Sequence, residues 1–125
     1  MEEKPNDLIA IVDDDESVRE ATASLLRSNK FGAEKFSSAE GFLNSPLLAK
    51  VRCLLLDIGM PGMGGLELQR RLAGHGRRIP IIFVTAHCDP ENRLQAMRAG
   101  AVDFLSKPFS EEALLKAIQL ALKSC

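Results

Sequence analysis

Short, mostly apolar runs recur along the 125-residue chain, and each is followed by polar residues, glycine or proline. A run that is apolar at successive positions is typical of a strand buried on both faces, as in a parallel sheet. The clearest run stops at the single carboxylate of Asp57. The pattern predicts strands at Leu8–Val12, Ala33–Phe36 (the weakest), Cys53–Leu56, Ile79–Val84 and Ala101–Leu105.

Apolar positions at helical spacing lie between the predicted strands. Two Ser-x-x-Glu sequences have the spacing of a capping box, in which the two side chains satisfy backbone donors at a helix start. An aspartate followed by proline, and a later serine, mark two more starts. The predicted helices begin at Ser17, Ser37, near Leu66, at Asp89 and at Ser110, and glycines at 32, 74, 76 and 100 are expected to end the first, third and fourth. Helical spacing turns Leu94, Met97 and Ala96 inward in the fourth helix, and Leu114, Ala117, Ile118 and Ala121 inward in the fifth.

The predicted strands alternate with the predicted helices along the chain. Alternation of this kind predicts an α/β fold, a doubly wound parallel sheet with helices on both faces. Right-handed crossovers place the carboxyl ends of the strands at one edge, which is where ligands bind in open sheets of this class. We expect one domain over residues 1–125, with residues 1–7 as an N-terminal tail.

Composition argues against several function classes. A formal net charge of −1 gives no general basic field that would attract nucleic acid. No apolar run is long enough to span a membrane, and the charged first residues lack the apolar core of a signal peptide. Three cysteines at unrelated spacings fit reduced thiols in a cytoplasmic protein.

Polar side chains follow four of the predicted strands, namely Asp13 and Asp14, Asp57, Thr85, and Lys107. Taken singly, each has an ordinary interpretation as a cap, turn or loop residue. Together, three carboxylates at one sheet edge repel by about 4 kcal/mol for each pair about 4 Å apart, at an effective dielectric constant of about 20. Such an edge requires positive charge. A hard dication, Mg²⁺ or Mn²⁺, and a lysine ammonium would supply it.

A magnesium site of this kind leaves room for a phosphoryl group, because the ion keeps several waters and takes one or two carboxylates. Asp57 is the predicted nucleophile, since a carboxylate can form an aspartyl phosphate. Phosphoryl transfer requires mainly positioning and neutralisation of charge. Lys107 and the Thr85 hydroxyl are expected to bind phosphoryl oxygens, with backbone N–H groups of the loop after Asp57 adding donors.

These motifs resemble the receiver domain of two-component response regulators, the CheY-like superfamily, over almost all of Leu8–Leu122. The resemblance rests on Asp13-Asp14, Leu56-Asp57-x-x-Met60-Pro61-Gly62, Thr85-Ala86 and Lys107-Pro108-Phe109. With Ala99-Gly100-Ala101-Val102-Asp103-Phe104, the motifs resemble most the FixJ branch, whose regulators usually carry a LuxR-type DNA-binding domain after the receiver. The resemblance implies a flavodoxin-like sheet with strand order 2-1-3-4-5.

The resemblance also implies a role for each site residue. Asp57 accepts a phosphoryl group from a phosphohistidine of a sensor histidine kinase. The implied metal ligands are Asp14, Asp57, the backbone carbonyl of Gly59 and Asp13, the last binding directly or through a water. Thr85 and Lys107 hold the phosphoryl group, Phe104 is the aromatic that turns inward as Thr85 moves, and the Lys107–Pro108 peptide bond is cis.

The same resemblance implies how a signal is passed on. Phosphorylation reshapes the face of the fourth helix, fifth strand and fifth helix, and the domain forms homodimers through it. The implied output is regulation of transcription, with DNA bound only by an output domain absent from this chain; a stand-alone receiver is the alternative. The domain assists its own phosphorylation and dephosphorylation and is not an enzyme for outside substrates. Gly59 leaves the phosphate lifetime open, and so does His87, which is either an exposed loop residue, the favoured interpretation, or a residue near the mouth of the site.

Two other functions fit part of the pattern. An aspartate-nucleophile phosphohydrolase tends to place its nucleophile after the first strand and to carry a cap, whereas Asp57 follows the third strand without an insertion that would form a lid. A flavodoxin-like cofactor binder needs a phosphate loop rich in Ser, Thr and Gly after the first strand. This chain has Asp13-Asp14-Asp15 there, which would repel a phosphate.

Overall fold

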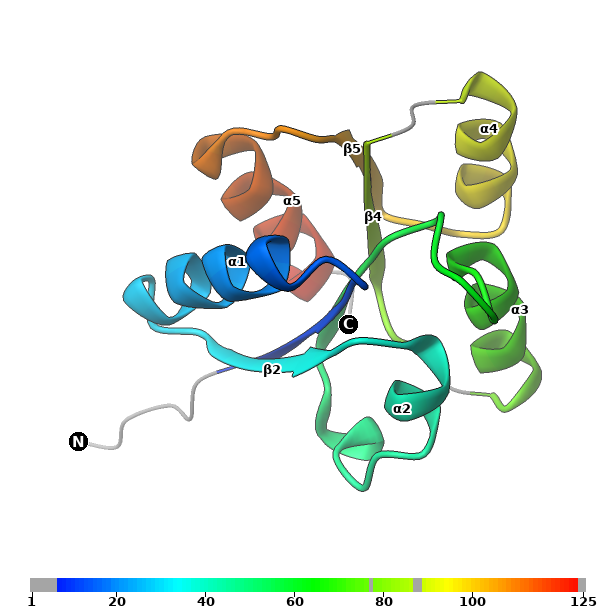
Figure 1. Cartoon of the computed structure of the whole chain (residues 1–125), viewed down its shortest axis with the longest axis horizontal. Coiled ribbons are helices and arrows are strands. Elements are labelled where there is room, and N and C mark those ends of the chain that lie inside the picture. The colour runs from blue at the N-terminus through cyan, green and yellow to red at the C-terminus, as the bar shows by residue number, and fades with distance from the viewer. Residues whose placement is uncertain (1–6, 77, 87–88, 124–125) are drawn as a thin grey trace.

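A five-stranded parallel sheet with helices on both faces forms the body of the protein in the computed structural model (Figure 1). The structure describes residues 7–76, 78–86 and 89–123. The strands are β1 Leu8–Val12, β2 Gly32–Phe36, β3 Cys53–Leu56, β4 Ile81–Thr85 and β5 Asp103–Ser106. The helices are α1 Glu16–Ser28, α2 Ala39–Leu43, the 3₁₀ turn η1 Leu48–Lys50, α3 Gly65–Gly74, α4 Pro90–Arg98 and α5 Glu111–Lys123.

The strand order is β2-β1-β3-β4-β5, and every pair is parallel. This confirms the predicted α/β class and the order 2-1-3-4-5. Because all the strands run the same way, their carboxyl ends share one edge of the sheet. β3 lies at the centre, so Asp57 stands in the middle of that edge.

Successive side chains of each strand point to opposite faces of the sheet, so the strands contribute to two separate hydrophobic cores, one on each face. One core joins alternate residues of β1, β3 and β4 to α1 and α5, including Ile9, Leu55 and Ile118. The other lies under α2, α3 and α4 and includes Leu54 and Phe83. Figure 1 shows the same division, with α1 and α5 on one side of the sheet and α2, α3 and α4 on the other. The predicted inner face of α5 is confirmed, because its four residues are buried.

The predicted starts of the first two helices were wrong by one or two residues. Asp15 caps α1 by accepting a hydrogen bond from the Val18 N–H, so Ser17 lies inside the first turn. Ser38, not Ser37, caps α2. Aspartate and serine both cap helices well, so a residue next to the predicted one can serve as the cap. The capping-box spacing alone therefore does not fix the first residue of the helix.

Two strand starts and one helix end also differ from the prediction. β4 begins at Ile81, since Pro80 has no N–H to give to the ladder. β5 begins at Asp103, because the Ala101 N–H bonds Ala96 and so closes the turn after α4. α1 ends with Lys30 in the left-handed region (φ +70°), whereas the expected terminator, Gly32, is already in β2.

The inner face predicted for α4 was wrong for Leu94 and Met97 and is confirmed for Ala96. Leu94 is 52% exposed and Met97 is 38% exposed, and Ala96 is the buried residue of this helix. The helix has nine residues and touches the sheet through its small alanine, which leaves its larger apolar side chains outside. α4 therefore presents apolar surface to solvent, as does α5 at Leu120, which is 51% exposed.

Candidate functional site

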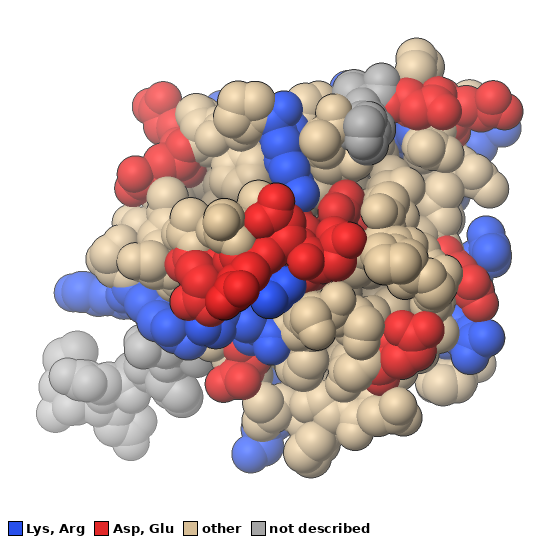
Figure 2. Space-filling model, in the orientation of Figure 1, with Lys and Arg blue, Asp and Glu red and all other residues tan. Residues whose placement is uncertain are grey.

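The carboxyl edge of the sheet gathers the acidic residues that the sequence places after β1 and β3. Asp13 and Asp57 are buried, at 1% and 8% exposure, and Asp14 is exposed. Each offers a carboxylate oxygen, and these oxygens lie within 4.8 Å of one another. Figure 2 shows acidic side chains gathered near the middle of this face. Parallel pairing explains the meeting, since β1 and β3 are neighbours and end at the same level.

Lys107 supplies the positive charge at this edge. Its Nζ lies 2.7 Å from Asp13 Oδ2 and 3.6 Å from Asp57 Oδ2. The side chain is largely buried. It extends from the residue directly after β5, which is an edge strand of the sheet. The structure therefore brings four of the predicted site residues, Asp13, Asp14, Asp57 and Lys107, into one cluster.

The pKa values of Asp57 and Lys107 are both raised, for different reasons. Burial raises the pKa of Asp57 above its usual value, and the charges of Asp13 and Asp14 add to the rise, while Lys107 opposes it. For Lys107, burial alone would lower the pKa, but its hydrogen bond to Asp13 and the charge of Asp57 outweigh burial and raise it. Without a further cation, burial and the like charges of Asp13 and Asp14 both disfavour the ionised form of Asp57.

The loop after β3 wraps closely around Asp57. The Gly59 N–H donates to Asp57 Oδ1 at 3.3 Å. Gly65 opens α3 directly against β3, where a Cβ atom would collide with the backbone carbonyl of Asp57. Glu40 of α2 accepts a hydrogen bond from the Met63 N–H at 3.3 Å and so ties the loop to the neighbouring helix. The loop is thus fixed from both sides.

Thr85 and Phe104 lie on the strands beyond Asp57. Thr85 ends β4, is buried, and its carbonyl accepts from the Lys107 N–H at 2.8 Å. Phe104 pairs with Phe83 across β4 and β5, and the two ring centroids are 6.1 Å apart. The resemblance implies that this ring turns inward on phosphorylation, but here it is already buried at 4% exposure. The Lys107–Pro108 peptide bond is cis.

The donor set fits a magnesium ion. Oxygen ligands from two buried carboxylates and one exposed carboxylate are the type that Mg²⁺ or Mn²⁺ takes, with water completing the shell. Within the described residues, this is where three or more possible His, Cys, Asp or Glu ligands come together. Asp13, Asp14 and Asp57 would hold the ion. The Gly59 carbonyl stays a prediction.

Sequence reasoning missed three contributors to the site. Arg19 donates to the Asp13 carbonyl at 2.7 Å, Glu40 holds the loop after β3, and Gly65 permits the close approach of α3. Glu40 belongs to the Ser37-x-x-Glu40 pattern, which indicates a helix start and not this role, and all three contacts involve backbone atoms that the fold brings close. His87 lies outside the described residues.

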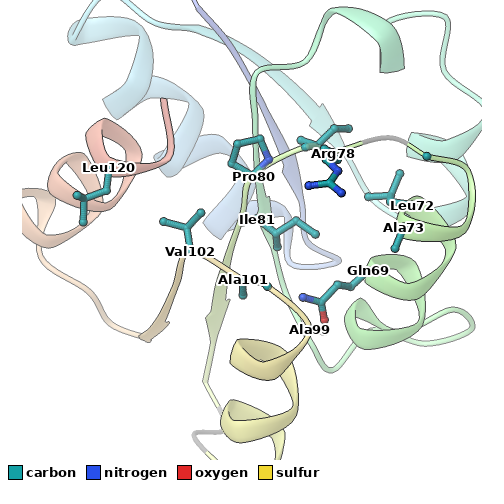
Figure 3. Close-up of a pocket in the computed structure, with 13 residues that line it drawn as sticks. Gln69, Leu72, Ala73, Arg78, Pro80, Ile81, Ala99, Ala101, Val102 and Leu120 are labelled. Carbon is teal, nitrogen blue, oxygen red and sulfur yellow. The ribbon is translucent and has the colours of Figure 1, made fainter. Parts of the chain in front are cut away.

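A separate hollow lies at the opposite edge of the sheet, between α3, α4 and the start of β5 (Figure 3). It has a volume of about 880 Å³. Arg78 is the one charged side chain among the described residues that line it, beside Gln69, which donates to the Ala96 carbonyl at 3.1 Å. A hollow with one cation lacks the groups for phosphoryl chemistry.

Comparison with known proteins gives the family of this chain. The family model described as the response regulator receiver domain matches residues 9–119. This chain belongs to the response regulator receiver domain family. The predicted resemblance to this family is therefore confirmed. In the part of the receiver that the structure describes, each helix is too short or too polar to cross a membrane.

Relatives and solved structures place the receiver near the FixJ branch. The response regulator protein TmoT of Ectopseudomonas mendocina is 51% identical over 116 residues, which make up 93% of this chain and 53% of that protein. The transcriptional regulatory protein FixJ of Azorhizobium caulinodans is 37% identical over 114 residues, covering 91% of this chain and 54% of that protein. The chain thus spans about half the length of these curated relatives.

Two solved structures share the fold closely. The response regulator StyR superposes with a TM-score of 0.88 at 47% identity, covering 95% of this chain and 60% of that chain. The structure titled FixJ-N superposes with a TM-score of 0.86 at 39% identity, covering 96% of each chain.

Proposed function

We propose that this receiver takes a phosphoryl group onto Asp57 from a sensor histidine kinase in a Mg²⁺-dependent reaction. The observation that carries the proposal is the cluster itself, three carboxylates with oxygens within 4.8 Å and a lysine 2.7 and 3.6 Å from two of them. A structural ion pair would need one carboxylate for one ammonium. The surplus of negative charge at a sheet edge is the property expected of a cation site.

In the proposed reaction, one oxygen of Asp57 attacks phosphorus, and the bond from phosphorus to the donor nitrogen breaks. The electron pair of that bond returns to the imidazole. When bound, the metal ion neutralises charge on the phosphoryl oxygens. Lys107, now paired to Asp13, swings its ammonium toward the phosphoryl group, and the N–H groups of the loop after Asp57 donate to it. The exposed side of Gly59 leaves this approach open, since nothing lies within 4 Å of where its Cβ would stand.

Signalling is proposed to run through Thr85 to the face of α4, β5 and α5. A phosphoryl group adds about −1.5 to −2 charges and three acceptor oxygens. The Thr85 hydroxyl would donate to it, and Phe104, already buried beside Phe83, would be held in this inward position. The state with the ring inside is then favoured, as a population shift requires.

The proposed consequence is homodimerisation through the α4, β5 and α5 face. Leu94 and Met97 of α4 and Leu120 of α5 are large apolar side chains exposed there. A second copy with the same patch would bury them, as a twofold interface does. The output is proposed to be regulation of transcription by a LuxR-type domain, since relatives are named transcriptional regulatory proteins. The cytoplasm is the proposed location.

Intact mass measurement tests the chemistry. Wild-type protein incubated with acetyl phosphate and Mg²⁺ should gain the mass of one phosphoryl group, and chelation of the metal should prevent the gain. Asp57→Asn should not gain it. Asp15→Asn is the matched control, because Asp15 lies outside the ligand set and asparagine caps a helix equally well. Labelling of Asp57→Asn to the wild-type level would refute the proposal.

A further inference from the structure

Arg19 lies on α1 and reaches back over the acidic turn. Its Nη1 donates to the backbone carbonyl of Asp13 at 2.7 Å. The bond is short and charge-assisted, which places it among the stronger hydrogen bonds of a protein. The side chain is half-buried, so solvent screens this bond only in part. The guanidinium contacts the cluster through a main-chain oxygen and leaves the carboxylate oxygens to other partners.

Every polar group of Asp13 is held by a different part of the fold. Its N–H donates to the Phe36 carbonyl at 3.1 Å, and its Oδ1 accepts from the Asp15 N–H at 3.0 Å. Its Oδ2 lies 2.7 Å from Lys107 Nζ. The bond from Arg19 completes the set at the carbonyl. Such a residue cannot rotate without breaking a hydrogen bond in a buried place.

The carbonyl is the point from which Asp14 is controlled. The Asp13 carbonyl and the Asp14 N–H belong to one planar peptide unit, so fixing the carbonyl fixes the plane on which Asp14 turns. Asp14 is exposed, and its neighbours Asp13 and Asp57 are of like charge. Repulsion would otherwise swing this exposed carboxylate outward, away from the position where its oxygen lies within 4.8 Å of the other two.

We propose that Arg19 is a positioning residue for the metal site: by holding the Asp13 carbonyl it keeps Asp13 and Asp14 directed at one divalent ion. The inference rests on the proposed function, because it needs Mg²⁺ to bind at this cluster. Partners that orient metal ligands typically change metal affinity by about 10–100-fold when removed.

The sign of the effect separates positioning from simple charge. Arg19 is a cation beside an acidic cluster, so its charge alone opposes a dication, and removing the charge would tighten Mg²⁺ binding by a few fold at most. Loss of positioning acts in the opposite direction. Arg19→Met, which removes both the charge and the hydrogen bond, should therefore weaken Mg²⁺ binding about tenfold. Arg19→Lys, which keeps the charge and one reaching donor, should recover part of the loss.

Arg27 provides a matched control on the same helix. It also donates to a backbone carbonyl six residues away, from Nη2 to Ala33 at 3.0 Å, but at the start of β2, away from the acidic edge. Arg27→Met removes the same kind of bond and the same charge from α1. Its Mg²⁺ affinity should stay within about twofold of wild type, because no ligand of the cluster depends on it.

Calorimetric titration with Mg²⁺ gives the affinity, and water-proton relaxation with Mn²⁺ counts the bound ion. Weaker binding by Arg19→Met, with Arg27→Met unchanged, supports the inference. Equal or tighter binding by Arg19→Met, with wild type binding normally, overturns it and leaves the proposed function standing. If wild type does not bind Mg²⁺, or if Asp57→Asn binds it as tightly as wild type does, the inference about Arg19 and the proposed function are both refuted. Should Arg19→Met not fold, Arg19→Gln is titrated against the same criteria.

Discussion

In the metal-free protein the charge of Asp57 lowers the free energy of unfolding, whereas the charge of Lys107 raises it. Burial and like-charged neighbours raise the pKa of Asp57, so the native state holds a proton there more tightly than the unfolded chain does. Stability from this group is present at low pH and is lost as the pH rises through the raised pKa. At neutral pH an ionised Asp57 is therefore destabilising.

Asp57→Asn should accordingly raise the thermal midpoint of the metal-free protein at pH 7 by a few degrees, which corresponds to about 1 kcal/mol for a domain of this size. The gain should shrink as the pH falls toward the ordinary aspartate value of 3.8, because the raised pKa lets native Asp57 take up its proton before that pH is reached. Calorimetric melts with chelator present measure it. A lower midpoint for Asp57→Asn at pH 7 would contradict the charge argument.

Lys107→Met should have the reverse effect. It leaves the buried carboxylate of Asp13 without its partner at 2.7 Å, and breaking a buried pair from one side costs about 3 kcal/mol. Urea unfolding without metal should show this loss, and Mg²⁺ should restore part of it by supplying a cation. An unchanged free energy of unfolding would mean that Asp13 does not depend on this ammonium.

At the scale of elements, α3 is packed onto the end of β3 at one glycine. Gly65→Ala would drive a Cβ atom into the backbone carbonyl of Asp57, which no side-chain movement can relieve. We expect a loss of about 2 kcal/mol or more in the free energy of unfolding. Gly74→Ala in the same helix is the control. It meets open space and should be neutral or stabilising by about 0.5–1 kcal/mol.

The apolar side chains of α4 should matter to assembly and not to folding. Leu94 is half-exposed, so Leu94→Glu should change the free energy of unfolding by no more than about 0.5 kcal/mol. It should abolish any shift in elution volume that acetyl phosphate and Mg²⁺ induce in wild type. Gln95→Glu adds the same charge one position along α4 and should retain the shift. A retained shift in Leu94→Glu would exclude Leu94 from the interface.

Sequence patterns predicted the elements well where the signal lies within one element. The apolar run of β3 and the inner face of α5 needed no knowledge of neighbours. The predicted burial of Leu94 and Met97 was wrong because helical spacing shows which residues share a face but not which face packs on the sheet. Here the face that packs is the one with Ala96. Arg19 and Glu40 were missed because each binds a backbone atom that the fold brings close.

At the scale of the whole molecule, the parallel sheet converts sequence position into spatial position. Asp13, Asp57 and Lys107 lie far apart in the chain, and each comes directly after a strand end. Once the strand order β2-β1-β3-β4-β5 is known, their meeting follows from topology. The motifs therefore predicted the cluster, whereas the distances of 2.7 and 3.6 Å to Lys107 needed the structure.

The central claim is that one of three crowded carboxylates, Asp57, accepts the phosphoryl group. Borohydride reduction of the acyl phosphate converts the modified aspartate to homoserine and so marks its position permanently. Peptide mapping of protein treated with acetyl phosphate and Mg²⁺ should find homoserine at position 57, and none when the metal is chelated. Homoserine at position 13 or 14, or at none of the three, would contradict the account.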